Sequence, residues 1–167
     1  MRILLGQNFN SEEVKERKFK SVAKNRKAYH DFEVIQVFEA GVALWGTEVK
    51  SIRQGKISLQ EAYANFKDAD SLELFLLNFH ISPYEHGNRE NHEPKRPRKL
   101  LLKHRELVKL KTGVQEKGLT IIPLSIYFSG PYVKIELGLV RAKKKYDKRE
   151  AVKERDTERE IRKKYRV

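Results

Sequence analysis

The chain has 167 residues, and its 36 Lys and Arg against 23 Asp and Glu give a formal net charge of +13. That length suits one domain with an extension, and the charge favours nucleic acid, or else an anionic membrane surface, as the partner. The absence of cysteine excludes disulfides, thiolate catalysis and the usual structural zinc sets. No apolar run is long enough for a membrane span or a signal peptide, so we expect a cytoplasmic protein without membrane contact.

Short apolar segments separated by glycines dominate the chain from Phe32 to Val140. Residues 1–22 precede them as a variable polar extension, which we expect to be a short helix or disordered. The spacing predicts strands at residues 32–39, 43–52, 72–81, 119–128 and 132–140. The last two are expected to form a hairpin around the turn signal at residues 129–131.

Residues 132–140 show the clearest strand alternation. The odd-numbered positions from Val133 to Leu139 are apolar, whereas Lys134 and Glu136 between them are charged. This period of two predicts that one face of the strand joins the core and that the other meets solvent or a ligand.

Two helices are expected to interrupt the strands. The first covers residues 59–64, with Ser58 as its N-cap and Glu61 three residues later. The second begins near His104, and Gly113 is available just past its end. Several short strands with few helices predict a mainly β fold. Among such folds, we expect a closed β-barrel of the oligonucleotide-binding (OB) type at residues 23–140, with flanking helices.

The segment 141–167 is a basic C-terminal tail with 13 Lys and Arg, 6 Asp and Glu, and few apolar residues. Tyr146 and Tyr165 lie among its cations, where a ring can stack on a base while its neighbours neutralise phosphates. Glu158 and Arg162 have the i, i+4 order that supports a helix. We therefore expect a tail that is disordered or helical and that meets RNA.

A second basic cluster, PKRPRKLLL, lies at residues 94–102. A solvated loop with core leucines and a phosphate-binding loop fit its composition equally well. The three leucines cannot all face inward from one helical face, so one is expected to be exposed. An apolar side chain beside cations suits contact with unpaired RNA bases.

No pattern in the sequence indicates catalysis, a cofactor or a metal site. His80, His86 and His92 are six residues apart, which matches no metal-ligand spacing, and we expect them in loops and on the surface. Glu39 and Glu48 lie in expected strands without a partner that would make an acid–base pair, so structural or orienting roles are favoured. Phosphate-loop and nucleophile motifs are also missing from the sequence.

Six long segments resemble, in the same order, the SmpB family of SsrA-binding proteins. They are NRKAYHDF from Asn25, FEAGVALWGTEVKSIRQGK from Phe38, ISPYEHG from Ile81, RPRKLLLKHREL from Arg96, VQEKGLTIIPLSIYF from Val114 and KKKYDKRE from Lys143. The resemblance covers residues 24–150. It implies a non-catalytic OB-type barrel that binds the tRNA-like domain of transfer-messenger RNA (tmRNA, also called SsrA).

The resemblance also implies a role in trans-translation. The protein would accompany tmRNA, with elongation factor Tu bound to that RNA, into the empty A site of a stalled ribosome. Its tail would occupy the decoding centre of the small subunit and the vacant mRNA channel. Ribosome rescue and tagging of the nascent peptide for degradation would follow. We expect the protein to act as a monomer.

Residue by residue, the family's RNA-binding positions correspond to Asn25, Phe32, Glu39, Arg98, Lys99, Leu101 and Lys134. The three basic residues are expected to neutralise phosphates, and Phe32 and Leu101 to give stacking or apolar contact. Glu39 can accept hydrogen bonds, and Asn25 can donate and accept them. The family's decoding-site motif corresponds to Lys143, Lys144, Tyr146, Asp147, Lys148 and Arg149. Tyr146 would stack on a ribosomal base.

Three other functions remain open on composition. A general single-strand RNA-binding barrel would bind many RNAs with a steep salt dependence. A structural ribosomal protein would use the same basic tail to thread folded RNA. A nuclease is the enzyme alternative, and it is the weakest because no metal-binding carboxylate set is evident.

Overall fold

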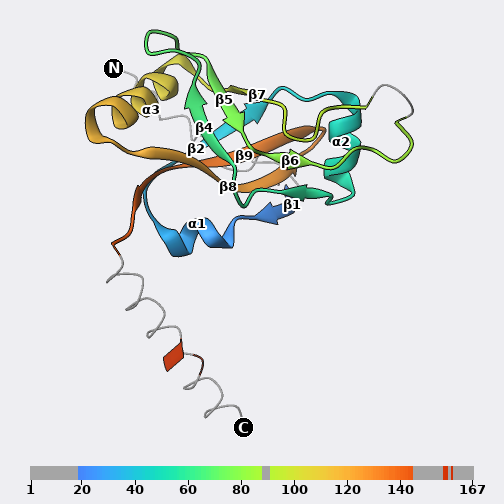
Figure 1. Cartoon of the computed structure of the whole chain (residues 1–167), viewed down its shortest axis with the longest axis horizontal. Helices are drawn as coiled ribbons and strands as arrows, with labels where there is room; N and C mark the ends of the chain where they lie inside the picture. The colour runs from blue at the N-terminus through green and yellow to red at the C-terminus, as the bar shows by residue number, and fades with distance from the viewer. Residues whose placement is uncertain (1–18, 88–90, 145–155, 158, 160–167) are drawn as a thin grey trace, which may run out of the picture.

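The computed structural model describes residues 19–87, 91–144, 156, 157 and 159 (Figure 1). In chain order the elements are β1 (Phe19–Lys24), α1 (Arg26–Asp31), β2 (Phe32–Val42), α2 (Gly46–Arg53), β3 (Ile57–Ser58), β4 (Tyr63–Phe66), β5 (Leu74–Leu77), β6 (His80–Ile81), β7 (Arg98–Leu101), α3 (His104–Lys117), β8 (Thr120–Ser129) and β9 (Tyr132–Ala142). The fold is mainly β, as expected. None of the described helices is long and apolar enough to cross a membrane.

Seven strands form one antiparallel sheet in the order β1-β8-β4-β5-β7-β2-β9, and β8 also pairs with β9. The short strands β3 and β6 pair separately. Helices α2 and α3 lie at opposite ends of this sheet, and α1 lies along a third side (Figure 1). The core between them is mainly aliphatic, with Leu74, Leu76, Ile135 and Leu137 fully buried.

The predicted hairpin is confirmed. Strands β8 and β9 pair antiparallel from Thr120 opposite Val140 to Ser129 opposite Tyr132. The positions from Val133 to Leu139 that alternation predicted to be inward are buried, whereas Lys134 and Glu136 are partly exposed. Strand β2 is also confirmed and runs three residues further than predicted, because it pairs with β9 and then with β7.

Residues 43–52 do not form the predicted strand. Residues 46–53 form α2 instead, and its buried side chains are Glu48, Ser51 and Ile52. Those positions are three and four residues apart, which is the spacing of one helical face. The alternation of apolar residues that follows β2 therefore stops at Leu44. From Gly46 on, the buried residues have the spacing of a helix.

The predicted helix at residues 59–64 is also wrong. Residues 63–66 form β4, which pairs along its length with β5 and at Ala64 with β8. These pairings satisfy the backbone groups that a six-residue helix would leave largely without partners. The predicted strand at 72–81 is confirmed in part, since it is divided into β5 and β6 near Asn78, whose φ is 54°.

Helix α3 begins at His104 as predicted, but it continues through Gly113 to Lys117. The end is set by Gly118, which is left-handed with a φ of 60°. Gly113 serves a different purpose, because a Cβ atom there would lie 2.6 Å from Cδ2 of Leu139. The glycine lets α3 pack closely against β9.

The sheet begins earlier in the chain than the barrel segment assigned from sequence. Strand β1 pairs with β8 from Phe19 opposite Ser129 to Lys24 opposite Ser125. Residues 19–22 therefore belong to the sheet rather than to a separate extension.

Candidate nucleic-acid interface

A groove of about 650 Å³ brings together four of the seven RNA-binding residues predicted from the sequence. These four are Glu39 from β2, Lys99 and Leu101 from β7, and Lys134 from β9. The start of α3 forms another wall through Lys103, Glu106 and Leu107. Residues from three strands and a helix thus converge on one surface, although they are far apart in sequence.

Two cations of the groove, Lys99 and Lys134, already have a carboxylate partner. The ammonium of Lys99 lies 2.5 Å from Glu73, and that of Lys134 lies 3.3 Å from Glu39. The hydrogen bond and charge of Lys99 hold the pKa of Glu73 below its ordinary value. A phosphate entering the groove would therefore compete with carboxylates for both cations. The sequence analysis missed Glu73, because only the pairing of β5 with β7 brings Glu73 close to Lys99.

Leu101 is 54% exposed, whereas its neighbour Leu100 is buried. The expectation that one leucine of the cluster is exposed is thus confirmed, although the leucines alternate on a strand rather than follow a helix. The exposed side chain lines the groove together with Lys99 and Lys134 and gives it an apolar contact area.

A second hollow adjoins the groove at Glu39. Its other lining residues come from β1, β8 and β9 and are Ser21, Lys24, Ser125, Tyr127 and Glu136. Glu39 lies opposite Glu136 in the register of β2 and β9, and such like-charged pairs are unfavourable without compensation. Compensation comes from hydroxyl groups, because Tyr127 donates to Glu39 at 2.5 Å and Ser125 donates to Glu136. Burial and the Glu39 carboxylate raise the pKa of Tyr127.

Phe32 and Asn25 lie at a third hollow, beside α1. Phe32 is partly buried against the small apolar cluster of Ala28, Ile122, Leu124 and Val140. Asn25 is only 5% exposed, and its side chain accepts from the Ala28 amide and donates to the carbonyls of Leu59 and Pro123. These hydrogen bonds hold α1 against β8, and the RNA contact expected for Asn25 stays a prediction.

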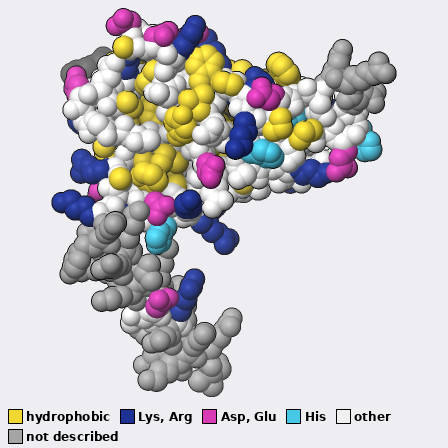
Figure 2. Space-filling view, in the orientation of Figure 1, with side chains coloured by type: hydrophobic (Ala, Val, Ile, Leu, Met, Phe, Trp, Pro, Cys, Tyr) yellow, Lys and Arg dark blue, Asp and Glu magenta, His cyan; other side chains and the backbone are white. Residues whose placement is uncertain are grey.

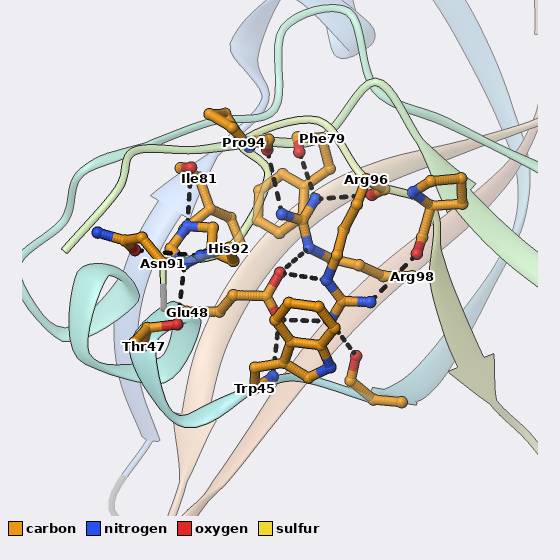
Figure 3. A network of polar contacts seen from close by, with 12 residues as sticks. Trp45, Thr47, Glu48, Phe79, Ile81, Asn91, His92, Pro94, Arg96 and Arg98 are labelled. Atoms are coloured by element: carbon orange, nitrogen blue, oxygen red, sulfur yellow. Dashed lines mark hydrogen bonds and ion pairs between the residues drawn. The ribbon is translucent and has the colours of Figure 1, made fainter. Parts of the chain in front are cut away.

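Arg98 also makes its hydrogen bonds within the protein. Its side chain is fully buried, and its Nε donates to Glu48 at 2.8 Å. Its remaining nitrogens donate to the carbonyl oxygens of Phe79, Arg96 and Pro94 (Figure 3). Arg98 is not among the residues that line the groove, and its expected phosphate contact stays a prediction.

Glu48 is the centre of this polar network. It is fully buried and accepts from Arg98, from Arg96 and from the backbone amide of Trp45. Burial alone would raise the pKa of Glu48, but these hydrogen bonds outweigh it and leave the pKa below its ordinary value. Burial lowers the pKa of Arg98, and the Glu48 carboxylate opposes that shift. The structural role expected for Glu48 is thus borne out, although it lies on a helix.

His92 is 3% exposed rather than on the surface. Its ring nitrogens contact the hydroxyl of Thr47 at 3.0 Å and the carbonyl of Ile81 at 3.1 Å, which ties His92 to α2 and β6. Among the residues that the structure describes, no group of three or more His, Asp or Glu is arranged to hold a metal ion.

Lys143 and Lys144 are the described residues of the predicted decoding-site motif. The amide of Lys143 donates to the carbonyl of Asp31 at 3.0 Å, and its ammonium donates to the carbonyl of Tyr29 at 3.2 Å. The last carbonyls of α1 thus fix where the chain leaves β9. Tyr146, Asp147, Lys148 and Arg149 lie outside the described residues.

The space-filling view shows how these side chain types are distributed. Hydrophobic side chains gather across the visible face, with Lys and Arg side chains beside them and around the margin (Figure 2). A surface with apolar area beside cations suits contact with unpaired bases and phosphates.

Comparisons with known proteins all point to the same family. The family model of the SmpB protein matches residues 22–167. The SsrA-binding protein of Carboxydothermus hydrogenoformans is 57% identical over 144 residues, which cover 86% of this chain and 95% of that protein. The SsrA-binding protein of Desulfitobacterium hafniense (strain DSM 10664 / DCB-2) is 52% identical over 147 residues, with coverage of 88% and 92%. A chain from a solved structure described as "tmRNA-SmpB: a journey to the center of the bacterial ribosome" is 48% identical, has a TM-score of 0.61 and covers 78% of this chain and 93% of that one.

Proposed function

The chain belongs to the SmpB family, and from this premise we propose that it is an SsrA-binding protein of trans-translation. It binds tmRNA through the tRNA-like domain and enables rescue of stalled ribosomes. The single observation that carries this proposal is the groove in which Lys99, Lys134 and the exposed Leu101 converge. Cations and an apolar side chain on one concave surface match folded RNA with unpaired bases.

The proposed RNA-binding unit is an OB-type closed barrel at residues 23–140, joined at its start by residues 19–22 of β1. The succession of paired strands supports closure, since β8 pairs with β4, β4 with β5, β5 with β7, β7 with β2, β2 with β9 and β9 again with β8. The groove lies on the outer side of β2, β7 and β9. In this proposal Glu39, Lys99, Leu101 and Lys134 contact RNA directly, Phe32 offers an aromatic edge beside α1, and Arg98 and Asn25 hold the scaffold.

The tail at residues 141–167 serves the ribosome in this proposal. Lys143, Lys144, Tyr146, Asp147, Lys148 and Arg149 enter the decoding centre, and the residues beyond them follow the empty mRNA channel. The anchoring of Lys143 to α1 supports a fixed starting direction for this tail. The protein acts in the cytoplasm as a non-catalytic monomer, and elongation factor Tu meets it only through the RNA.

The first experiment measures binding of the full-length protein to the tRNA-like domain of tmRNA near physiological salt. An excess of unrelated structured and single-stranded RNA competes in the same titration. Binding that survives the competitor, and that weakens in Lys99→Ala and Lys134→Ala, supports shape-specific recognition. Loss of binding to any competitor would favour a general single-strand binder, and stable stoichiometric presence in ribosomes without a stalled message would favour a structural ribosomal protein.

A further inference from the structure

Trp45 is the only tryptophan of the chain, and it is 55% exposed at the start of α2. The Arg96 guanidinium lies over its ring, 4.4 Å from the ring centroid (Figure 3). Trp45 does not line the groove described above. Its indole thus has a cation against one side and a large exposed area elsewhere.

Hydrogen bonds to Glu48 and to the backbone hold Arg96 in position. Its Nε and one terminal nitrogen donate to the two oxygens of Glu48 at 2.9 and 2.5 Å, and its other terminal nitrogen donates to the Pro97 carbonyl at 3.3 Å. Glu48 is fully buried, so this fork is held by the interior of the protein. Hydrogen bonds to Glu48 and Pro97 thus hold the guanidinium in place over the indole. Stacking of this kind holds the ring in one orientation.

Backbone alternation places Trp45 on the same side as the groove. Val42 and Leu44 pack against the core. The alternate residues Ala43 and Trp45 are exposed. The outward row of β2 therefore continues from Glu39 to Trp45, and Trp45 itself has an extended backbone. Six extended residues span roughly 20 Å, at about 3.3 Å per residue.

A backbone hydrogen bond connects the groove strand β7 with the segment that carries Trp45. The Ala43 amide donates to the Lys99 carbonyl at 2.9 Å, so Lys99 of the groove lies beside Ala43, two residues before Trp45. An RNA strand that leaves the groove past Lys99 in this direction meets Trp45 next. Its phosphates would find Lys99, and its next unpaired base would find the indole.

We propose that Trp45 is a stacking platform for an unpaired base of the same RNA that occupies the groove. This inference rests on the proposed function and extends its interface along β2 to the start of α2. Arg96 is a positioning residue that orients the indole, and the buried Glu48 fixes Arg96. Base stacking on an aromatic side chain is sequence-tolerant, so the platform contributes affinity rather than base identity.

Tryptophan fluorescence of the unlabelled protein reports on the platform directly, because Trp45 accounts for all of it. The full-length protein is titrated with the tRNA-like domain of tmRNA, and binding is followed in parallel by the anisotropy of a dye on the RNA. We expect saturable quenching of the tryptophan signal with the same midpoint as the anisotropy change. An unchanged tryptophan signal at saturating RNA would overturn the platform and leave the proposed function intact.

Substitution separates stacking from simple apolar contact. Trp45→Leu should weaken RNA binding on the order of tenfold, whereas Trp45→Phe, which keeps an aromatic face, should retain most of the affinity. Val108→Ala on α3 is the control, since it also removes exposed apolar surface but lies outside the platform. Equal affinities of the wild-type protein and Trp45→Leu would refute the inference.

Two further outcomes are decisive. Quenching by ribosomes but not by the tRNA-like RNA would assign Trp45 to a different partner and overturn the inference. A wild-type protein whose anisotropy titration shows no RNA binding would overturn the proposed function, and the platform with it.

Discussion

Arg98 and Lys99 are adjacent cations with opposite environments. Arg98 is fully buried and paired with Glu48, whereas the Lys99 side chain is 46% exposed in the groove. Neighbouring residues on a strand point to opposite faces, so a single step along β7 separates a buried scaffold residue from a residue that lines the groove. The two positions therefore allow a matched test of the two roles.

Arg98→Leu should lower the free energy of unfolding by about 3–5 kcal/mol, because it leaves a buried carboxylate with fewer partners. Lys99→Ala should change that free energy by less than about 0.5 kcal/mol, yet weaken RNA binding and reduce its salt dependence by about one phosphate contact. Urea unfolding and RNA titrations at several salt concentrations measure both effects. A stable Arg98→Leu protein that loses RNA binding would contradict the assignment.

The protonation of Glu48 should contribute to acid sensitivity. Its pKa is lower in the folded protein than its ordinary value, so the folded state binds this proton more weakly than the unfolded state. The corresponding stability is complete above the unfolded pKa of about 4.3 and is lost as the pH falls below it, through the folded pKa.

Unfolding free energies measured at a series of acidic pH values should therefore decline more steeply for the wild-type protein than for Glu48→Gln. The variant should also be less stable at neutral pH, because Arg98 and Arg96 lose their ionic partner. Parallel curves for the two proteins below pH about 4.3 would show that Glu48 is not responsible.

At the scale of elements, one residue joins three segments. Asn25 caps α1 by accepting a hydrogen bond from the Ala28 amide. It also donates to the carbonyl of Leu59, which precedes β4, and to the carbonyl of Pro123 in β8. Helix α1 has only six residues, so its position depends on such contacts rather than on its own propensity. Phe32 follows α1 directly, and thus the third hollow depends on the same cap.

Asn25→Ala should destabilise the protein by about 2–4 kcal/mol, through the lost cap and two buried carbonyls without a donor. Asn25→Asp keeps an acceptor for Ala28 but sets a carboxylate against those carbonyls, so it should not restore stability. Thermal unfolding compares the variants. RNA affinity under conditions where Asn25→Ala is folded should equal that of the wild-type protein, and a selective loss of affinity would instead indicate direct contact.

At the scale of the whole molecule, the groove and the start of the tail lie on different parts of β9. Lys134 reaches the groove, whereas Lys143 follows the end of the strand and is held by α1. Binding of RNA and entry into the ribosome can therefore be separated by truncation.

Deletion of residues 146–167 retains Lys143 and its contacts with α1. We expect the shortened protein to bind the tRNA-like domain with nearly full affinity and to fail in tagging of stalled peptides. Titration with RNA and a reconstituted tagging assay measure the two activities. Normal tagging by the shortened protein would contradict the proposed tail mechanism.

Local patterns in the sequence determined several features correctly. The alternation from Val133 to Leu139 predicted the orientation of β9, His104 marked the start of α3, and the segments from Asn25 to Lys143 identified the family. These features are local, because side-chain periodicity and sequence motifs can be read within one short stretch of chain.

Only the tertiary structure decided which polar residues face the solvent. Arg98 is buried because Glu48, fifty residues away in sequence, accepts its hydrogen bond, and residues 63–66 form a strand because β5 and β8 supply partners. Gly113 lies inside α3, where the close approach of Leu139 leaves no room for a Cβ atom. Each of these outcomes depends on a partner distant in sequence, whereas local pattern contains information only about neighbours. The sequence alone therefore established the family, the hairpin and the basic tail, and tertiary pairing selected the residues that line the groove.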